Sequence, residues 1–201
     1  MRELSLHILD AMQNSLEAGA TRIELTIEED LAADRLTITI RDNGRGMDEE
    51  QLARISDPFF TTRNTRHVGL GIPLFKAAAE HCNGSLTVTS RLGEGTTVRA
   101  TFQHSHIDRA PLGDITSTLL AVILGKPCDV RYVHRIIGRR EDTGTWRQGD
   151  REFAFDTASI KAELGDVPLT HPEVRRWLAE FIAEGERALQ EAGGKRQEAF
   201  R

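Results

Sequence analysis

Cysteine is scarce in this chain, which contains only Cys82 and Cys128 among its 201 residues. Their spacing matches no metal-binding motif, and two cysteines are too few for a disulfide framework. We therefore expect both residues to be reduced, buried thiols.

Long apolar runs are also missing. No stretch approaches the roughly 20 apolar residues that a transmembrane helix needs. The N-terminal residues are acidic and amphipathic rather than typical of a signal peptide. Together with the reduced cysteines, these absences predict a cytoplasmic protein with no membrane association.

The chain has no excess of positive charge. Its formal net charge is −5, which gives no general attraction to nucleic acid or to anionic membranes. A nucleic-acid-binding role is therefore disfavoured. The 39% of hydrophobic and 28% of charged residues are ordinary for a soluble protein with a real core. The length allows one large domain, or a domain of usual size with an extension.

The first half of the sequence predicts the order helix, strand, strand, helix, loop, helix, strand, strand. Leu4, Ile8, Ala11 and Met12 recur at helical spacing, and Gly19 ends that helix. Apolar and polar residues alternate in the strands, so one face of the sheet is expected to be buried. We predict helices over residues 2–18, 48–55 and 69–82, strands over residues 21–27, 36–40, 86–90 and 97–102, and an irregular loop over residues 56–68.

After Gln103 the sequence changes character. A polar segment leads to an apolar run over residues 119–124, which Gly125 and Pro127 end. We expect residues 104–201 to form a small α+β extension packed as a second layer on residues 1–103. Its predicted elements are strands near residues 130–133 and 153–155, a charged loop over 138–149, and helices over 157–164 and 171–192. Its predicted core residues are Phe153, Phe155, Trp177, Leu178, Phe181 and Ile182.

An acidic residue and two closely spaced glycines stand at the end of the second strand. Asp42 offers a carboxylate acceptor, and Gly44 and Gly46 leave the backbone beside it bare. This combination suits a flat, amine-bearing heterocycle such as adenine. The alternative is a tight turn between strands, because Asp-Asn-Gly is also a hairpin signal.

Two further features suit a nucleotide's phosphates. Asn14 lies on the first helix and offers a neutral oxygen of the kind that Mg²⁺ shares with phosphate and water. Gly69, Leu70 and Gly71 open a helix, whose unpaired amides and positive dipole end favour an anion such as triphosphate.

Five segments in this order resemble the GHKL, or Bergerat-fold, ATPases, which include DNA gyrase, mismatch-repair ATPases, large chaperone ATPases and the catalytic domains of histidine kinases. The resemblance covers residues 1–103. The segments are Asp10-Ala11-Met12-Gln13-Asn14-Ser15-Leu16-Glu17-Ala18-Gly19-Ala20-Thr21, Asp42-Asn43-Gly44-Arg45-Gly46-Met47, Asp57-Pro58-Phe59-Phe60-Thr61-Thr62-Arg63, Gly69-Leu70-Gly71-Ile72 and Gly93-Glu94-Gly95-Thr96-Thr97-Val98. Any one alone would be weak, but five in order on the expected elements are specific.

The resemblance implies a fold and a set of roles. It implies an α/β (α+β) sandwich, with a mixed sheet and helices on one face. It makes Asn14 the magnesium ligand and Asp42 the acceptor of the adenine amino group, with Thr96 beside it. Arg63 could meet the terminal phosphate, although loop arginines are more often only solvated. The remaining residues that it assigns to the nucleotide are Gly44, Gly46, Met47, Phe60, Thr61, Thr62, Gly69, Leu70 and Gly71.

The chain departs from the family at Asp10. Hydrolytic members carry a glutamate here that orients or deprotonates the attacking water, and aspartate is one methylene shorter. Because a general base needs hydrogen-bond reach, hydrolysis is expected to be slow, or the reaction to be phosphotransfer. The short loop resembles histidine kinases and the first helix resembles mismatch-repair ATPases, so the sequence lies between subfamilies.

The segment after residue 103 leaves two alternatives open. His106 stands in a partial likeness to the phosphoacceptor motif of histidine kinases, but the expected acidic neighbour is displaced to Asp108. His104, His106 and Asp108 also alternate, which on a strand would place all three on one face, within reach of a metal. The plainer interpretation is a polar connection.

These features predict an Mg-ATP-binding protein, a stand-alone histidine kinase-like ATPase or phosphotransfer protein in signalling. The alternatives are a non-enzymatic, ATP-dependent interaction switch and a protein serine kinase of the anti-sigma type. We expect a partner protein to bind the C-terminal part. The sequence does not indicate the oligomeric state.

Overall fold

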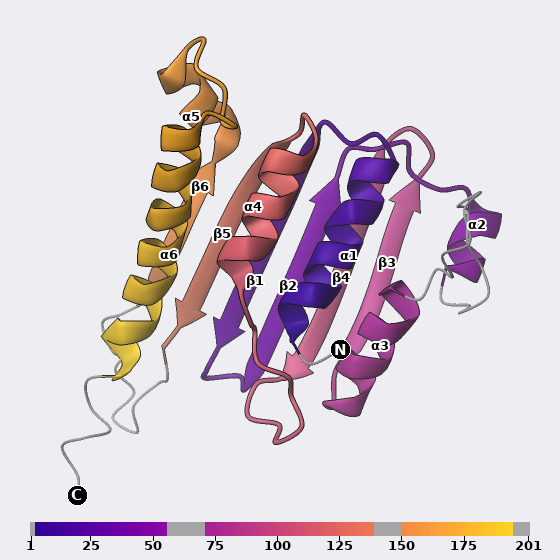
Figure 1. The fold of residues 1–201 in the computed structure, drawn as a ribbon. Coiled ribbons are helices and arrows are strands. Elements are labelled where there is room, and N and C mark those ends of the chain that lie inside the picture. The colour runs from indigo at the N-terminus through magenta and orange to yellow at the C-terminus, as the bar shows by residue number, and fades with distance from the viewer. Residues whose placement is uncertain (1–2, 56–70, 139–149, 195–201) are drawn as a thin grey trace, which may run out of the picture.

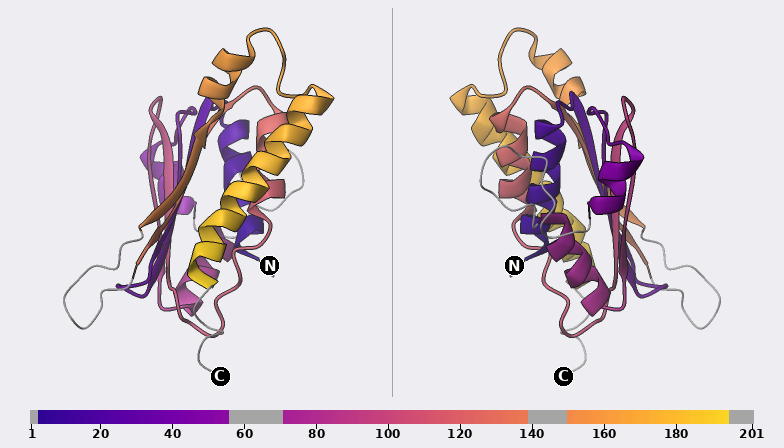
Figure 2. Two further views of the ribbon diagram at one scale, coloured as in Figure 1. Left: turned by 90° about the vertical axis from the view of Figure 1, so that its left-hand side faces the viewer. Right: turned by 90° about the vertical axis from the view of Figure 1, so that its right-hand side faces the viewer.

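A computed structural model describes residues 3–55, 71–138 and 150–194 of the chain, and the side chains of these residues up to 191. The described residues form a six-stranded mixed sheet in the order β3-β4-β2-β1-β5-β6. Figure 1 shows helices packed in front of this sheet, and the edge-on views of Figure 2 show α1, α3, α4 and α6 on the same side. The α+β fold predicted from the sequence, with helices on one face, is confirmed.

The elements follow the predicted order closely, including those of the C-terminal part. The helices are α1 (Leu4–Glu17), α2 (Glu49–Arg54), α3 (Gly71–His81), α4 (Ile115–Gly125), α5 (Thr157–Leu164) and α6 (Pro172–Gly194). The strands are β1 (Arg22–Asp30), β2 (Arg35–Asp42), β3 (Ser85–Arg91), β4 (Gly95–Gln103), β5 (Asp129–Ile137) and β6 (Arg151–Asp156).

The alternation of the strands decides which face meets the helices. Ile23, Leu25 and Ile27 of β1 are fully buried, whereas the residues between them are partly exposed. Their partners in β2, among them Ile38 and Ile40, lie on the same face. Burying these apolar side chains under the helices supplies most of the driving force for folding. The opposite face of this largely antiparallel sheet is polar, as is usual where no second layer covers it.

The expectation that residues 104–201 pack as a second layer is wrong, because β5 and β6 continue the same sheet beyond β1. β5 pairs in parallel with β1 along its whole length, from Arg22 opposite Asp129 to Asp30 opposite Ile137. The other edge of β1 is paired with β2. The pairing with β5 therefore satisfies the backbone groups of β1 that would otherwise lie at an open edge of the sheet. A division of the chain near residue 103 stays a prediction.

The start of α1 is held by the connection that follows β4. The amides of Leu4 and Ser5 donate to the carbonyl oxygens of Pro111 and Leu112, at 3.0 and 2.8 Å. These bonds satisfy two of the amides that a helix N-terminus leaves unpaired. The connection thereby fixes α1, which carries two of the predicted site residues, Asp10 and Asn14, against the rest of the fold.

Aromatic rings fill the space between α6 and the outer strands. Tyr132, Phe153, Phe155 and Phe181 pack with ring centroids 5.4 to 6.1 Å apart. The prediction that Trp177 belongs to this core is wrong, because Trp177 is 45% exposed and stacks on Phe181 from outside. Among the described helices none is long and apolar enough to cross a membrane.

Candidate functional site

The N-terminus of α3 meets α1 at Asp10. A Cβ atom added to Gly71, the first residue of α3, would lie 3.3 Å from the Cβ of Asp10 and 3.6 Å from its Oδ2. One turn further into α3, the ring of Phe75 stacks on His7, which precedes Asp10 by one turn of α1. The two helices therefore run in opposite directions. Asn14 lies one turn, about 6 Å, beyond the point where α3 begins.

Asp42 is held at the end of β2 by three donors from three different segments. Its Oδ2 accepts the hydroxyl of Ser15 at 2.7 Å. Its Oδ1 accepts the amides of Gly44 at 2.9 Å and Thr96 at 3.3 Å. The side chain is only 8% exposed, so these bonds compensate the cost of burying a carboxylate and fix its orientation.

The bond from Ser15 joins the C-terminal half of α1 to the end of β2. Ser15 directly follows Asn14 on α1, and its hydroxyl reaches Asp42 across the helix–sheet interface. The bond places the turn of α1 that carries Asn14 close to Asp42. That the side chains of Asn14 and Asp42 face one common site stays a prediction. A polar residue in the apolar stripe of α1 was the available signal for Ser15.

The glycines around Asp42 are required by contacts within the chain. Gly46 has a φ of +65°, and a Cβ there would lie 1.9 Å from the carbonyl oxygen of Arg91. A Cβ on Gly44 would lie 2.9 Å from the Cβ of Ala18. Any side chain at Gly46 would therefore push residues 42–47 away from the turn after β3. That these glycines also admit a base stays a prediction.

Ser90 and Asn43, which the sequence interpretation missed, fix the backbone around Asp42. The hydroxyl of Ser90 accepts the amide of Met47 and donates to the carbonyl of Gly95, both at 2.9 Å. The side-chain oxygen of Asn43 accepts the amides of Thr21 and Arg22, both at 2.9 Å. Ser90 carries no sequence signal, because a serine in a strand is common. Asn43 lies within the segment 42–47, but an asparagine in a turn is common too, and the sequence interpretation assigned its side chain no role.

An open pocket of about 510 Å³ adjoins this segment. Asp42 and Thr96 line it at the sheet, Ser90 lines it from β3, and Leu52 lines it from α2. Its lining does not include Asp10 or Asn14. A smaller pocket of about 340 Å³, against Asp34 and Gln103, lies at the other end of the sheet and contains none of the predicted residues.

The oxygen atoms near the start of α3 suit a metal carried by phosphate. Asp10 and Asn14 are one turn apart on α1 and offer a carboxylate and an amide oxygen on one face. Among the described residues no group of three or more His, Cys, Asp or Glu side chains forms a metal site. Mg²⁺ usually takes only one or two protein ligands and completes its shell with phosphate and water, so this donor set fits it.

Six predicted nucleotide-binding residues lie outside the described part of the chain. They are Phe60, Thr61, Thr62, Arg63, Gly69 and Leu70. The described ones fall into two groups: one around Asp42 at the end of β2, and one where Asp10 lies against Gly71. That both groups bind one nucleotide stays a prediction.

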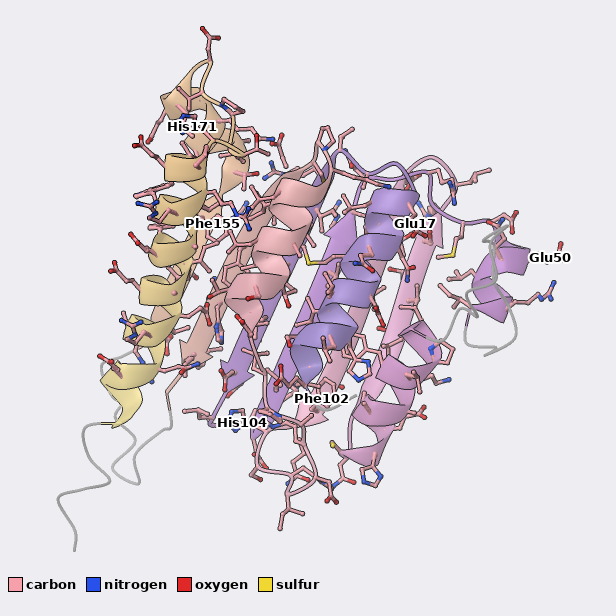
Figure 3. The ribbon with its side chains drawn as sticks, viewed as in Figure 1. Glu17, Glu50, Phe102, His104, Phe155 and His171 are labelled. Carbon is pink, nitrogen blue, oxygen red and sulfur yellow. The ribbon has the colours of Figure 1, made fainter. Side chains whose placement is uncertain are left out.

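His106 is not brought there. β4 begins at Gly95 in the pocket and ends at Gln103, which places His106 more than about 20 Å away along the strand. In Figure 3 its neighbour His104 lies at the opposite end of the sheet from Glu17. The Nδ1 of His106 accepts the amide of Asp108 at 3.2 Å. His106 also lies against His81, with ring centroids 6.2 Å apart, at the end of α3 that is about 15 Å along the helix from Gly71. Direct transfer to His106 within one molecule, from the pocket or from the start of α3, is therefore geometrically unfavourable.

The metal alternative for this segment required a strand, and the structure does not provide one. β4 ends at Gln103, and residues 104–105 form a turn. His104 instead donates from Nε2 to Glu29 at 2.6 Å. Asp108 pairs with His81 at 3.6 Å. The idea that His104, His106 and Asp108 share one face is wrong.

The first half of the chain matches a known family. A family model described as "Histidine kinase-, DNA gyrase B-, and HSP90-like ATPase" matches residues 2–106. The sensor protein kinase FleS of Pseudomonas aeruginosa is 39% identical over 108 residues, 54% of this chain and 26% of that protein. A putative sensor protein of Shewanella frigidimarina is 34% identical over 103 residues, 50% of this chain and 16% of that protein.

The chain therefore spans only 26% and 16% of the length of these two relatives. Among solved structures, the N-terminal domain of a DNA repair protein aligns with a TM-score of 0.49 and 14% identity. That alignment covers 77% of this chain and 52% of the other.

Proposed function

The chain belongs to the family of histidine kinase-, DNA gyrase B- and HSP90-like ATPases, and from this premise we propose that it binds Mg-ATP between Asp42 and the start of α3. The observation that supports this placement is the hydrogen bond from Ser15 to Asp42 at 2.7 Å. It joins the helix that carries Asn14 to the strand end that carries the buried carboxylate.

In this proposal each end of the site recognises a different part of the nucleotide. Asp42 has both oxygens oriented by protein donors, and a carboxylate retains lone pairs for a further donor such as the adenine amino group. At the other end, the first amides of α3 and its positive dipole end attract the phosphates. Asn14 and Asp10 would hold the magnesium ion, which when bound neutralises phosphate charge.

We propose phosphoryl transfer in signalling as the activity. The support is the likeness to sensor proteins named as kinases, together with Asp10 in place of a longer carboxylate. Asp10 lies against Gly71, so its carboxylate can accept a proton only from a group close to the start of α3. Slow hydrolysis and transfer to another protein are both compatible with that reach.

A nucleotide-dependent interaction switch is the second candidate. The short reach of Asp10 favours it, because a site can bind ATP tightly without a well-placed general base. The C-terminal part would then present the partner-binding surface. The anti-sigma type of serine kinase shares the same site but gives no role to that part.

Incubation with γ-labelled ATP separates these activities. Label that stays on the protein and is lost in His106→Ala supports autophosphorylation between molecules. Phosphate release that is lost in Asp10→Ala supports hydrolysis. Tight binding with neither outcome supports the switch, and no binding at all contradicts the proposed function.

We also propose a cytoplasmic location. The support is that Cys82 and Cys128 are both free and buried. Their thiols show raised pKa values because burial disfavours the thiolate, so both are unreactive structural residues.

A further inference from the structure

His7 occupies an unusual position at the contact between α1 and α3. Its side chain is 4% exposed, and its ring stacks on Phe75 with centroids 5.0 Å apart and planes 8° apart. Burial lowers the pKa of His7 from 6.5 to about 4, so the ring is neutral near neutral pH. It acts here as a flat, uncharged group between two helices.

One nitrogen of this ring is unsatisfied. Among the residues that the structure describes, Nδ1 of His7 is the buried side-chain nitrogen or oxygen that has no hydrogen-bond partner. Buried polar atoms are almost always paired, because removing them from water without a replacement bond is costly. A phenylalanine would keep the stack on Phe75 and remove that cost, so stability does not explain a histidine here.

The position of His7 connects its unpaired Nδ1 to the proposed nucleotide site. His7 touches Phe75, and one turn further along α1 Asp10 touches Gly71. These two contacts lie one helical turn apart between the same two helices. Any movement of α3 that changes the surroundings of the His7 ring therefore also moves the start of α3 relative to Asp10.

We propose that His7 is a positioning residue whose unpaired Nδ1 raises the free energy of the α1–α3 arrangement seen here. Phosphate binding at the start of α3 shifts α3 into a second arrangement, in which Nδ1 is hydrogen-bonded. The inference rests on the proposed Mg-ATP site. It assigns to His7 no contact with the nucleotide. The unpaired nitrogen acts by lowering the free-energy difference between the two arrangements, so that the ligand has less to overcome.

His7→Phe tests this because it removes the costly atom and keeps the stack. Without nucleotide, the variant should unfold at a higher temperature than the wild type. Its affinity for ATP should nevertheless be roughly 5- to 150-fold weaker, the coupling that one unsatisfied group can supply. Adenosine has no phosphates and should bind the variant and the wild type equally.

Three further variants make the test specific. His7→Asn keeps a polar atom near the Nδ1 position and should restore most of the ATP affinity while losing the stack. His7→Leu removes the same nitrogen with a smaller side chain if His7→Phe does not fold. His81→Phe adds the same ring at the exposed far end of α3, where the side chain is 70% exposed, and should change neither property.

The outcomes are distinguishable by calorimetry and thermal unfolding on the full chain. The inference is overturned if His7→Phe binds ATP as well as the wild type, if it also weakens adenosine, or if it is less stable without ligand. A wild-type protein that binds no ATP contradicts the proposed function itself, and the inference with it.

Discussion

The structure predicts that His134 makes folding stability strongly pH-dependent. His134 of β5 is 0% exposed and donates from Nδ1 to Glu186 of α6 at 2.9 Å and from Nε2 to Glu29 of β1 at 3.0 Å. Tyr132 donates to the same Glu186 at 2.8 Å, and His104 donates to Glu29 at 2.6 Å. A charged imidazole thus stands between two carboxylates at the joint of α6 and the sheet.

The pKa values give the size and the direction of the effect. Burial alone would lower the pKa of His134, but the hydrogen bonds to Glu186 and Glu29 outweigh it and raise the pKa from 6.5 to about 9. The same bonds lower the pKa of Glu29 from 4.5 to about 2, against the opposing effect of its burial. At about 1.36 kcal/mol per pKa unit, the His134 difference corresponds to about 3 kcal/mol of stability.

Because the folded pKa is the higher one, this stability is fully present below pH 6.5 and is lost as the pH rises through 9. The matching contribution of Glu29 is present above pH 4.5 and is lost as the pH falls through 2. The pKa shifts of His134 and Glu29 report the same ion pair, so their contributions to stability are not added together. The removal of one partner from a buried ion pair costs about 3–5 kcal/mol, which agrees with the estimate from the pKa of His134.

His134→Gln provides the test, with urea unfolding measured from pH 6 to pH 10. We expect the variant to be about 3 kcal/mol less stable than the wild type at pH 6.5 and nearly equal to it at pH 9.5. Cys82, Cys128 and Tyr132 also destabilise the folded state at high pH, since burial raises their pKa values. The test therefore uses the difference in unfolding free energy between the wild type and His134→Gln at each pH. His81→Gln, at an exposed contact with Asp108, is the matched control and should change stability by less than about 0.5 kcal/mol.

A wild-type stability that is flat between pH 6.5 and 9.5, or a variant with the same slope as the wild type, would refute this account of His134.

Three further predictions concern the site and its supports. Gly46→Ala should destabilise the protein by several kcal/mol in urea unfolding, because the new Cβ would meet the carbonyl oxygen of Arg91. Gly93→Ala is the control and should cost about 1 kcal/mol, because nothing lies within 4 Å of its Cβ. Equal effects of the two substitutions would contradict the contact at Gly46. Asp48→Ala removes the cap that accepts the Gln51 amide and should cost about 1 kcal/mol without affecting the fold measured by circular dichroism, and no loss of stability would argue against the cap. Asn14→Ala should abolish the gain in ATP affinity that magnesium gives while leaving adenosine binding intact, and an unchanged magnesium effect in calorimetry would exclude Asn14 as its ligand.

Local patterns predicted most of the fold because each element is consistent with its own sequence signals. The helical spacing of Leu4, Ile8 and Met12 predicted α1, and Asp48 predicted the start of α2. The alternation of Ile23, Leu25 and Ile27 predicted both β1 and its buried face. Signals of this kind depend only on neighbours in the chain, which a sequence displays directly.

What the sequence could not predict depends on pairing between distant segments. The parallel pairing of β5 with β1 joins residues more than 100 positions apart, and neither strand carries a mark of its partner. The bond from Ser15 to Asp42 and the cluster around His134 have the same origin. Trp177 was misplaced because helical spacing alone does not distinguish the edge of a core from its centre.

The central claim, that Asp42 binds the adenine of ATP, is tested most directly by calorimetric titration of ATP into the wild type and Asp42→Asn. The asparagine can keep its oxygen toward the amides of Gly44 and Thr96 and turn its amide group toward Ser15, whose hydroxyl can instead donate to the carbonyl of Ala11. The variant should therefore fold. We predict that it binds ATP at least about 10-fold more weakly, because a charge-assisted bond is worth about 1.5–3 kcal/mol. A folded Asp42→Asn protein with unchanged ATP affinity would contradict the account.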